Sequence, residues 1–492
     1  MKKYFFTAIA LILILNCTEL FAQVSQANND DSVVTTQSGK VKGRLLNGLI
    51  VFKSILYTAP PVGEYYFAIP APHPPWQGIR DATKQGPTAP FPKQEAGDID
   101  DTPTIGEGWI KGNDFLTTNV WTPATGDKHL PVMVYIHGGA FVIGTSDVPL
   151  FDGTAFAKKG VVMVSLYYRM GIVGFLKIPG VLSNLGIRDQ IAALKWVQDN
   201  IAAFGGAKDN VTVFGESAGA ISVGVLIASP AVKRLFKRCI MQSGSGQAAL
   251  SGEQADRIAT QYAKTLNIKN NRESYLHFTP EELLATQPKV TLKMLTLKTK
   301  THADPTDGVA IFFPVIDGDI ISDMPLTTVR NKQAYAYDLL LGYNTDEINL
   351  FLIPTGVLKK IKFPLVLNIA VRKVHPAPAA LISLFRKEYP QKNLGEIFSA
   401  ILTSYQAQVA AIRFAKAQAA SGGKTFMYEF AWPSSVKNGI FGSYHGLEIL
   451  FVFNNLQSKG DTGMLGPQGG PQQLADKMQD AWVKFATNGN PG

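Results

Sequence analysis

One serine lies in a turn whose neighbours suit a nucleophile. The stretch Phe-Gly-Glu-Ser-Ala-Gly-Ala at 214–220 holds Ser217 between small residues, after an apolar, β-branched run at 211–214 and before apolar residues that continue to Leu226. A strand that turns sharply into a helix needs small neighbours, and it exposes the serine hydroxyl at the carboxyl end of a sheet, above a helix N-terminus. Ser217 is therefore a candidate nucleophile. On this motif alone, a glycine-rich connection with a chance serine remains the alternative.

A serine nucleophile needs a base, and the sequence offers four downstream histidines. In folds with this kind of serine turn, the chain order is serine, acid, histidine. His445 lies in a tight segment at 442–446, after a strand-like run at 425–430, where such a base belongs. The others lie in polar or proline-containing stretches and are expected to be exposed: His277, His302 and His375.

The acid that orients the base has two candidates. Asp346 and Glu347 are adjacent and follow a strand-like run at 338–341. The carboxyl end of a parallel strand is where a catalytic acid is expected. Capping of the next helix accounts for one of the two acids but need not account for both, so the residues alone leave the choice open.

The donors for an oxyanion are expected from a glycine-rich turn. His-Gly-Gly-Ala-Phe at 137–141 follows a strand-like run at 131–136. Backbone N–H groups approach a reacting carbonyl only where side chains are absent or tiny. Gly139 and Ala140 fit this need, and Ala218 at the start of the predicted helix supplies a third donor. Each such donor contributes roughly a hundredfold to a thousandfold in rate.

Strand-like runs that alternate with helical stretches must position these residues. The runs lie at 116–121, 131–136, 161–166, 211–214, 238–242, 338–341 and 425–430. The clearest helix is predicted over 188–204, where apolar residues recur at helical spacing. This alternation predicts an α/β fold with a parallel, doubly wound sheet.

Three other stretches are predicted to surround that sheet. Residues 32–90 are expected to form antiparallel strands and loops over one edge, and 457–473 a loop. Two partly helical insertions, 250–310 and 354–420, are expected to form the walls of a substrate gorge above the strand ends.

The composition is that of a globular protein, with 46% hydrophobic and 17% charged residues among 492. The formal net charge is +9, but Lys and Arg are scattered and are not clustered with aromatic residues. This pattern favours a mildly basic surface over nucleic-acid binding. A basic patch that recruits anionic substrates or adheres to an anionic surface is a weaker alternative.

The N-terminus is predicted to be a secretion signal that spans residues 1–22. Two lysines precede an apolar run at 4–15, and Ala22 offers a small residue for cleavage. A lipoprotein signal at Cys17 is disfavoured because Asn16 precedes it, and no other run is long and apolar enough to span a bilayer. We therefore expect an exported chain, periplasmic or extracellular.

Cleavage at this point would leave Cys239 as the single cysteine, without an intramolecular disulfide. We expect this thiol to be packed in a strand and inert, as suits a bacterial envelope protein.

Taken together, the motifs resemble those of the type-B carboxylesterase family of α/β-hydrolases, which includes bacterial p-nitrobenzyl esterases and the cholinesterases. The resemblance covers about residues 33–485. Further segments that carry it are Pro-Pro-Val-Gly-Glu at 60–64, Asn-Val-Trp-Thr-Pro at 119–123, Asn-Leu-Gly-Ile-Arg-Asp-Gln at 184–190, Phe-Gly-Gly at 204–206 and Gln-Ser-Gly-Ser at 242–245.

The resemblance implies an α/β-hydrolase fold in a single domain over 23–492, without a metal or organic cofactor. It implies Ser217 as nucleophile and His445 as base, and it selects Glu347 over Asp346 as the acid. The same resemblance implies that Gly139, Ala140 and Ala218 form the oxyanion hole and that Ser243 lies near the triad. It also implies a structural pair of Arg188 and Asp189.

Four departures from the family pattern carry expectations of their own. Ala140 replaces a glycine found in many members, which would narrow the site for bulky alcohols. Ile348 replaces the glycine that usually follows the acid, which would alter the turn that orients Glu347. Phe115 stands where animal members have a disulfide cysteine. The sequence ends at Gly492, before a Trp- and Pro-containing segment typical of the family, which predicts a truncated C-terminus.

The expected function is a serine carboxylic-ester hydrolase that acts on a small-molecule ester through an acyl-enzyme. An amidase or lactonase would share the machinery, and a non-catalytic binding protein on the same fold is the rival class. A specialised choline esterase is disfavoured, because Trp109 is the only indole in the 85–115 region.

Overall fold

The structure is a computed structural model that describes residues 32–93, 97–244, 246–295 and 311–492. The predicted secretion signal at 1–22 and His302 lie outside the described residues.

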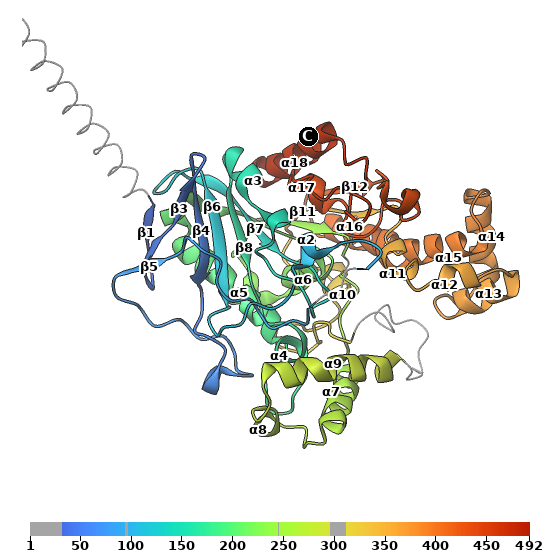
Figure 1. Cartoon of the computed structure of the whole chain (residues 1–492), viewed down its shortest axis with the longest axis horizontal. Helices are drawn as coiled ribbons and strands as arrows, with labels where there is room; N and C mark the ends of the chain where they lie inside the picture. Colours follow the sequence, from blue (N-terminus) through green and yellow to red (C-terminus); the bar gives the residue numbers. More distant parts are fainter. Residues whose placement is uncertain (1–31, 94–96, 245, 296–310) are drawn as a thin grey trace, which may run out of the picture.

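A nine-stranded sheet forms the centre of the molecule (Figure 1). Its spatial order is β12 (Thr425–Phe430), β11 (Asp338–Asn344), β10 (Arg238–Gln242), β9 (Gly206–Glu216), β7 (Leu130–Ile136), β8 (Val162–Leu166), β6 (Thr117–Thr122), β4 (Leu49–Leu56) and β3 (Arg44–Leu46). The strands from β12 to β8 are parallel, and β6, β4 and β3 pair antiparallel at one edge. The predicted parallel sheet is therefore confirmed, with an antiparallel edge.

The N-terminal region departs in part from its prediction. A separate small sheet holds β1 (Val33–Thr36), β2 (Gly39–Lys42) and β5 (Ile79–Asp81). β1 and β2 form the expected antiparallel pair, but β5 pairs parallel with β2. The intervening β3 and β4 leave this small sheet and pair along the edge of the large one.

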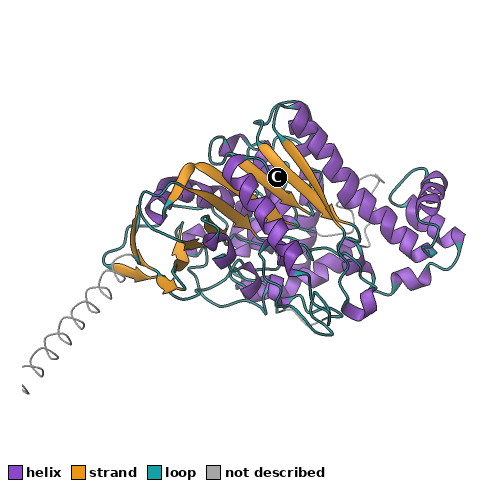
Figure 2. Cartoon of the chain, turned by 90° about the horizontal axis from the view of Figure 1, so that it is seen from above, coloured by secondary structure: helices purple, strands orange, loops and turns teal. Residues whose placement is uncertain are grey.

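Helices cover both faces of the large sheet (Figure 2). Side chains of β7 alternate between two cores: Val132, Val134 and Ile136 belong to one, and Met133 and Tyr135 to the other. The first core contains α5 (Leu185–Asn200) and α6 (Ala218–Ala228), and the second contains α3 (Thr154–Lys158), α17 (Ile449–Val452) and α18 (Gln472–Asn488). Alternate residues of a strand point to opposite faces, so these are the two faces of the sheet.

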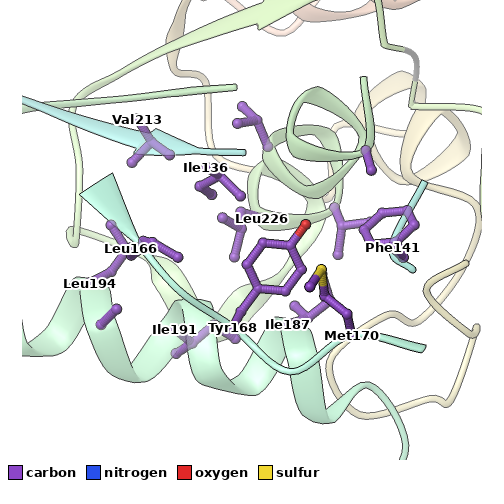
Figure 3. Close-up of a cluster of buried hydrophobic side chains, with 14 of the residues drawn as sticks. Ile136, Phe141, Leu166, Tyr168, Met170, Ile187, Ile191, Leu194, Val213 and Leu226 are labelled. Carbon is purple, nitrogen blue, oxygen red and sulfur yellow. The ribbon is translucent and has the colours of Figure 1, made fainter. Parts of the chain in front are cut away.

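The first core includes residues next to the predicted site, among them Phe141 and Ala218. Figure 3 shows Ile187, Ile191 and Leu194 on α5 packed toward β-strand residues such as Val213. These α5 residues recur at helical spacing and are buried. The packing explains why the chain folds back after β8 and returns as β9, which carries Ser217 at its end.

The remaining helices lie in the connections. They are α2 (Thr102–Ile105), α4 (Gly171–Phe175), α7 (Gly252–Leu266), α8 (Arg272–Tyr275), α9 (Pro280–Leu295), α10 (Pro325–Arg330), α11 (Asn349–Leu352), α12 (Val357–Lys360), α13 (Pro364–Arg372), α14 (Pro378–Glu388), α15 (Leu394–Thr403) and α16 (Val409–Ala420). The described residues of both predicted insertions are largely helical, and residues 296–310 of the first insertion lie outside the described part of the chain. Helices α12 to α15 form a group at one end of the molecule (Figure 1). Their role as gorge walls stays a prediction.

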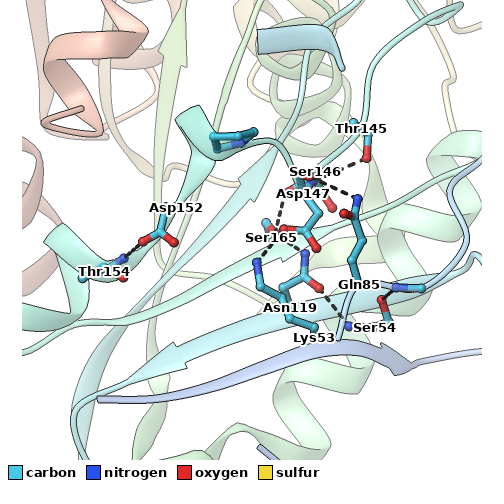
Figure 4. A network of polar contacts seen from close by, with 12 residues as sticks. Lys53, Ser54, Gln85, Asn119, Thr145, Ser146, Asp147, Asp152, Thr154 and Ser165 are labelled. Carbon is cyan, nitrogen blue, oxygen red and sulfur yellow. Dashed lines mark hydrogen bonds and ion pairs between the residues drawn. The ribbon is translucent and has the colours of Figure 1, made fainter. Parts of the chain in front are cut away.

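A buried polar network fixes the segment that follows the 137–141 turn (Figure 4). Asn119 accepts a hydrogen bond from the Ser54 N–H (2.8 Å) and donates to the Ser165 hydroxyl (3.2 Å), which donates to the Ser146 carbonyl (3.1 Å). Beside it, Lys53 pairs with Asp147 at 2.5 Å. The network ties β4, β6 and β8 to this loop.

Within the described part of the chain, no helix has the length and apolar character to cross a bilayer. Cys239 is free and buried in β10, as predicted, and burial raises the pKa of its thiol. A thiol with a raised pKa is a poor nucleophile, which agrees with an inert role.

Candidate active site

Ser217 occupies a strained turn between β9 and α6. Its backbone φ is 55° and ψ is −121°, and it is the residue immediately before α6. A Cβ on Gly219 would collide with the Ile136 carbonyl, and one on Gly215 would collide with the backbone of Gly219. Only glycines at these two positions let the turn pack this closely on β7. The sequence pattern around the serine is therefore a packing requirement.

The glycine-rich turn after β7 lies against Ser217. A Cβ on Gly138 would lie 3.2 Å from the Ser217 Cβ. Gly139 and Ala140 both have positive φ, at 101° and 53°. Among the described residues, their N–H groups have no hydrogen-bond acceptor. Ala218 is the first residue of α6, so its N–H has no acceptor within the helix. The three predicted donors thus come from two turns in contact and are free to bind an oxyanion.

His137, the first residue of this turn, is held in place by contacts with Tyr168. Its ring stacks on Tyr168, with centroids 4.6 Å apart, and the Tyr168 hydroxyl donates to the His137 carbonyl at 3.0 Å. Burial lowers the pKa of His137 to about 4. The imidazole is therefore neutral at ordinary pH and adds no charge beside the turn.

His445 and Glu347 form the closest acid–base contact of the site. Nδ1 of His445 lies 2.5 Å from Oε2 of Glu347, and Oε1 of Glu347 accepts the Asn344 N–H at 2.8 Å. Glu347 is buried just beyond β11, and His445 lies in the loop after β12. Parallel pairing of β11 with β12 brings the two loops together.

Asp346 has a different role, in agreement with the choice of Glu347. Its backbone N–H donates to the Ser443 carbonyl at 2.9 Å, and its Oδ2 accepts the Ser443 N–H at 3.1 Å. Asp346 therefore fastens the loop that carries His445, while its neighbour contacts the imidazole.

The imidazole Nε2 faces another carboxylate in this structure. It lies 3.2 Å from Oε1 of Glu216, and the Ser217 hydroxyl makes no hydrogen bond to a described residue. Catalytic hydrogen bonds often tighten only when substrate is bound. The structure thus brings His445 to Glu216, the residue before Ser217, without a direct hydrogen bond between His445 and Ser217.

Glu216 and Glu448 are site residues that the sequence reasoning missed. Both are buried, and Glu448 accepts hydrogen bonds from the side chains of Asn344 (2.6 Å) and Gln242 (3.3 Å). Trp482 of α18 donates to Gln242 at 3.0 Å. One signal was available: Glu448 is the single charged residue in the apolar run 447–453.

The pKa values around His445 follow from this burial. Burial raises the pKa of both Glu216 and Glu448, with further contributions from neighbouring carboxylates. Burial alone would lower the pKa of His445, but the carboxylates of Glu216 and Glu347 outweigh it and raise that pKa. The carboxylates around His445 therefore favour the protonated form of its imidazole.

The other predicted residues have the following places. Ser243 lies just after β10, with its N–H bonded to the Gly342 carbonyl at 2.9 Å, and its buried hydroxyl has no partner among the described residues. His277 is exposed, and His375 accepts the Ala377 N–H at 3.1 Å. Neither contacts the triad candidates through a hydrogen bond.

Arg188 and Asp189 do not pair with each other. Asp189 binds Arg169 through two side-chain hydrogen bonds of 2.8 and 2.7 Å, and both residues are buried. Arg188 pairs instead with Asp319 at 2.5 Å. Each has a structural role, as predicted, but with a separate partner.

Ile348 does not alter the turn after the acid. Its backbone is right-handed helical, with φ −74° and ψ −14°, so glycine is not required at this position. Its side chain is buried and its N–H donates to the Thr403 hydroxyl at 3.3 Å. The expectation that this replacement changes the turn is not supported by the backbone.

A cavity of about 720 Å³ is lined by residues of the 102–110 and 145–150 segments, and neither the triad candidates nor the predicted oxyanion residues line it. Trp109 lines the cavity, and the Lys111 ammonium lies 5.5 Å from the centre of one of its rings. Among the described residues, no group of three or more His, Cys, Asp or Glu side chains is arranged to hold a metal ion.

Comparison with known proteins gives one consistent picture. The model of the carboxylesterase family matches residues 30–492. The chain is 35% identical to the para-nitrobenzyl esterase of Bacillus subtilis (strain 168) over 466 residues, which are 93% of this chain and 90% of that protein. It is 31% identical to the liver carboxylesterase of Sus scrofa, over 98% of this chain and 89% of that protein. A crystal structure of a carboxylesterase from Geobacillus stearothermophilus superposes with a TM-score of 0.80 at 35% identity, covering 94% of this chain and 91% of that one.

Proposed function

The chain belongs to the carboxylesterase family and is a carboxylic ester hydrolase of the α/β-hydrolase fold, and we propose that Ser217, His445 and Glu347 are its catalytic triad. The 2.5 Å contact between His445 and Glu347 carries this assignment. The strained turn at Ser217 and the free N–H groups opposite it support the choice of nucleophile.

The proposed reaction has two halves. His445 accepts the Ser217 proton at Nε2 as the serine oxygen attacks the ester carbonyl, and the N–H groups of Gly139, Ala140 and Ala218 stabilise the oxyanion. The same proton then passes to the leaving alcohol, which leaves an acyl-enzyme. Water repeats the sequence, releases the carboxylic acid and restores the serine. Glu347 holds the imidazole and stabilises its cation throughout.

In this structure Nε2 must turn from Glu216 toward Ser217 before it can act. Oε1 of Glu216 is buried and accepts no hydrogen bond from a described residue, and its one ion-pair contact among them is with the imidazole Nε2 at 3.2 Å. We infer that substrate binding completes the serine–histidine bond.

The test combines hydrolysis with covalent labelling. The wild type is expected to hydrolyse p-nitrophenyl esters and to react with a fluorophosphonate, and mass spectrometry should find the label on Ser217. Ser217→Ala should abolish both. Ser222→Ala is the matched control on the same helix, because its hydroxyl only accepts a hydrogen bond from Gln190 at 3.1 Å. Labelling of another serine, or ester hydrolysis by Ser217→Ala at the wild-type rate, contradicts the assignment.

We propose further that the chain is exported to the periplasm or beyond, with residues 1–22 as the signal. The lysines before the apolar run at 4–15 and the small residue Ala22 support this. Expression in a bacterial host, followed by N-terminal sequencing of the protein released from the periplasm, is expected to find Gln23 first. Recovery of an uncleaved chain from the cytoplasm alone contradicts it.

A further inference from the structure

Helix α13 (Pro364–Arg372) presents large apolar side chains to solvent. Leu365 is 70% exposed and Ile369 55%, and Phe363, which precedes the helix, is 67% exposed. Single exposed apolar residues are normal on a soluble protein, whereas several on one helix mark an interaction surface. We call the exposed side chains of residues 359–373 the α13 surface.

Helix α13 is packed against the rest of the protein, although its outer side chains are exposed. Leu367 and Val371, on the opposite side of α13, are fully buried in a small separate core with Ile397 and Ile401 of α15. The exposed positions 365, 366, 369, 372 and 373 recur at helical spacing and share one side. The helix thus has an anchored inner face and an apolar outer face.

The charge around this outer face has one sign. From Ile348 to Lys387 the chain contains seven Lys and Arg residues and no Asp or Glu. The seven are all exposed: Lys359, Lys360, Lys362, Arg372, Lys373, Arg386 and Lys387. None forms an ion pair with a described residue. Elsewhere the chain mixes both signs, so this stretch holds much of the net charge of +9.

We propose that the α13 surface docks on an anionic phospholipid bilayer. Lysines that flank exposed Phe, Leu and Ile are the pattern of a helix that lies in the plane of a membrane interface. A second copy of the chain fits poorly, because a two-fold contact would place equal positive charges opposite each other. An acidic bilayer satisfies both the charge and the apolar side chains.

The same acid-free stretch begins beside the proposed catalytic base. Phe351 of α11 is 51% exposed, and its ring centroid lies 5.2 Å from that of His445. In Figure 1, α11 lies between the sheet and the α12–α15 group. Docking through α13 would therefore hold the exposed edge of the site close to esters dissolved in the bilayer. This part of the inference rests on the proposed function.

The binding test needs no catalysis. The exported chain carrying Ser217→Ala is mixed with vesicles of phosphatidylglycerol and phosphatidylcholine, or of phosphatidylcholine alone, and floated on a density gradient. Binding is expected to the anionic vesicles only and to weaken with added salt. Replacing Lys359, Lys360 and Lys362 with Gln should lower the apparent affinity by ~100-fold, because each cation contributes about fivefold near an anionic leaflet. Phe363→Ser with Leu365→Ser should also release the protein.

Matched controls lie elsewhere on the surface. Lys233, Arg234 and Lys237 are three exposed cations before β10, and Leu45 and Ile79 are exposed by 50% and 57% on β3 and β5. The corresponding Gln and Ser variants should bind as the wild type does. Equal loss in the control variants, or unchanged binding by the α13 variants, overturns the proposal. So does sedimentation that finds a dimer which the Phe363→Ser, Leu365→Ser variant separates.

A second arm tests delivery of substrate. In chains with Ser217 intact, the α13 variants should lose hydrolysis of a long-chain ester dissolved in anionic vesicles and retain hydrolysis of water-soluble p-nitrophenyl acetate. If the wild-type chain floats with anionic vesicles but hydrolyses neither ester, the proposed function fails and the α13 surface stands. Retained vesicle-ester hydrolysis by non-binding variants overturns the inferred delivery.

Discussion

Nε2 of His445 lies 3.2 Å from Oε1 of Glu216, the residue immediately before the proposed nucleophile. The imidazole is therefore held between two carboxylates, because its Nδ1 contacts Glu347 at 2.5 Å. This arrangement sets the protonation of the base and gives a first prediction.

Glu216→Gln is expected to shift the acidic limb of the pH–rate profile to lower pH. His445 accepts a proton only when neutral, so kcat/KM rises as the pH passes upward through its pKa. The carboxylates raise that pKa above its ordinary 6.5, and the substitution removes one of them. The profile of p-nitrophenyl acetate hydrolysis measures the shift, and a limb that stays in place or moves upward would show that Glu216 does not act on His445.

Glu347→Gln should lower kcat by about 10⁴-fold, as removal of the orienting acid does in comparable triads. Asp346→Asn is the adjacent control, since Asp346 bonds the Ser443 backbone and not the imidazole. We expect it to lower thermal stability with a much smaller loss of kcat. Steady-state kinetics and a melting curve separate the two effects, and equal losses of kcat would contradict the division of roles.

Gly139→Ala should abolish activity by closing the oxyanion turn. Its φ is 101°, and an added Cβ would collide with the Ile143 carbonyl, so the backbone must shift. Gly126 also has positive φ, at 74°, but a Cβ there meets open space. Gly126→Ala should cost about 1 kcal/mol of stability and leave kcat unchanged. Parallel assays of both variants test this, and an active Gly139→Ala enzyme would remove the turn from the mechanism.

Ala140→Gly is expected to favour esters of bulky alcohols. The methyl group of Ala140 lies in the turn that packs against Ser217. One methyl group changes discrimination between substrates by roughly 10- to 200-fold. The ratio of kcat/KM for tert-butyl acetate to that for ethyl acetate should rise. If the ratio is unchanged while both esters remain substrates, the methyl group does not limit the alcohol side.

Much of the fold was predictable because its signals are local. β10 and β12 occupy the predicted runs at 238–242 and 425–430, where apolar and β-branched residues gather. β11 extends past its predicted end at 341, because Gly342 to Asn344 continue to pair with β12. These residues resemble a loop in sequence, and only the neighbouring strand makes them a strand.

In the candidate site, too, features that depend on local sequence were predictable and features that depend on distant contacts were not. Small residues around Ser217 and Gly139 are visible in the sequence, because the turns demand them. Glu216 and Glu448 were missed as site residues because their importance depends on contacts with distant residues. Glu448 bonds Asn344, which is 104 positions away. A charged residue in an apolar run indicates that its side chain has a polar partner in the folded protein, but the sequence does not say which residue that partner is.

Trp482 of α18 donates a hydrogen bond to Gln242, 240 positions earlier in the chain. Gln242 in turn donates to the carboxylate of Glu448. During synthesis, Ser217 emerges from the ribosome long before Trp482 does. The polar network around the proposed base is thus complete only when α18 has docked. Esterase activity should therefore appear only after the chain has been synthesised past Trp482.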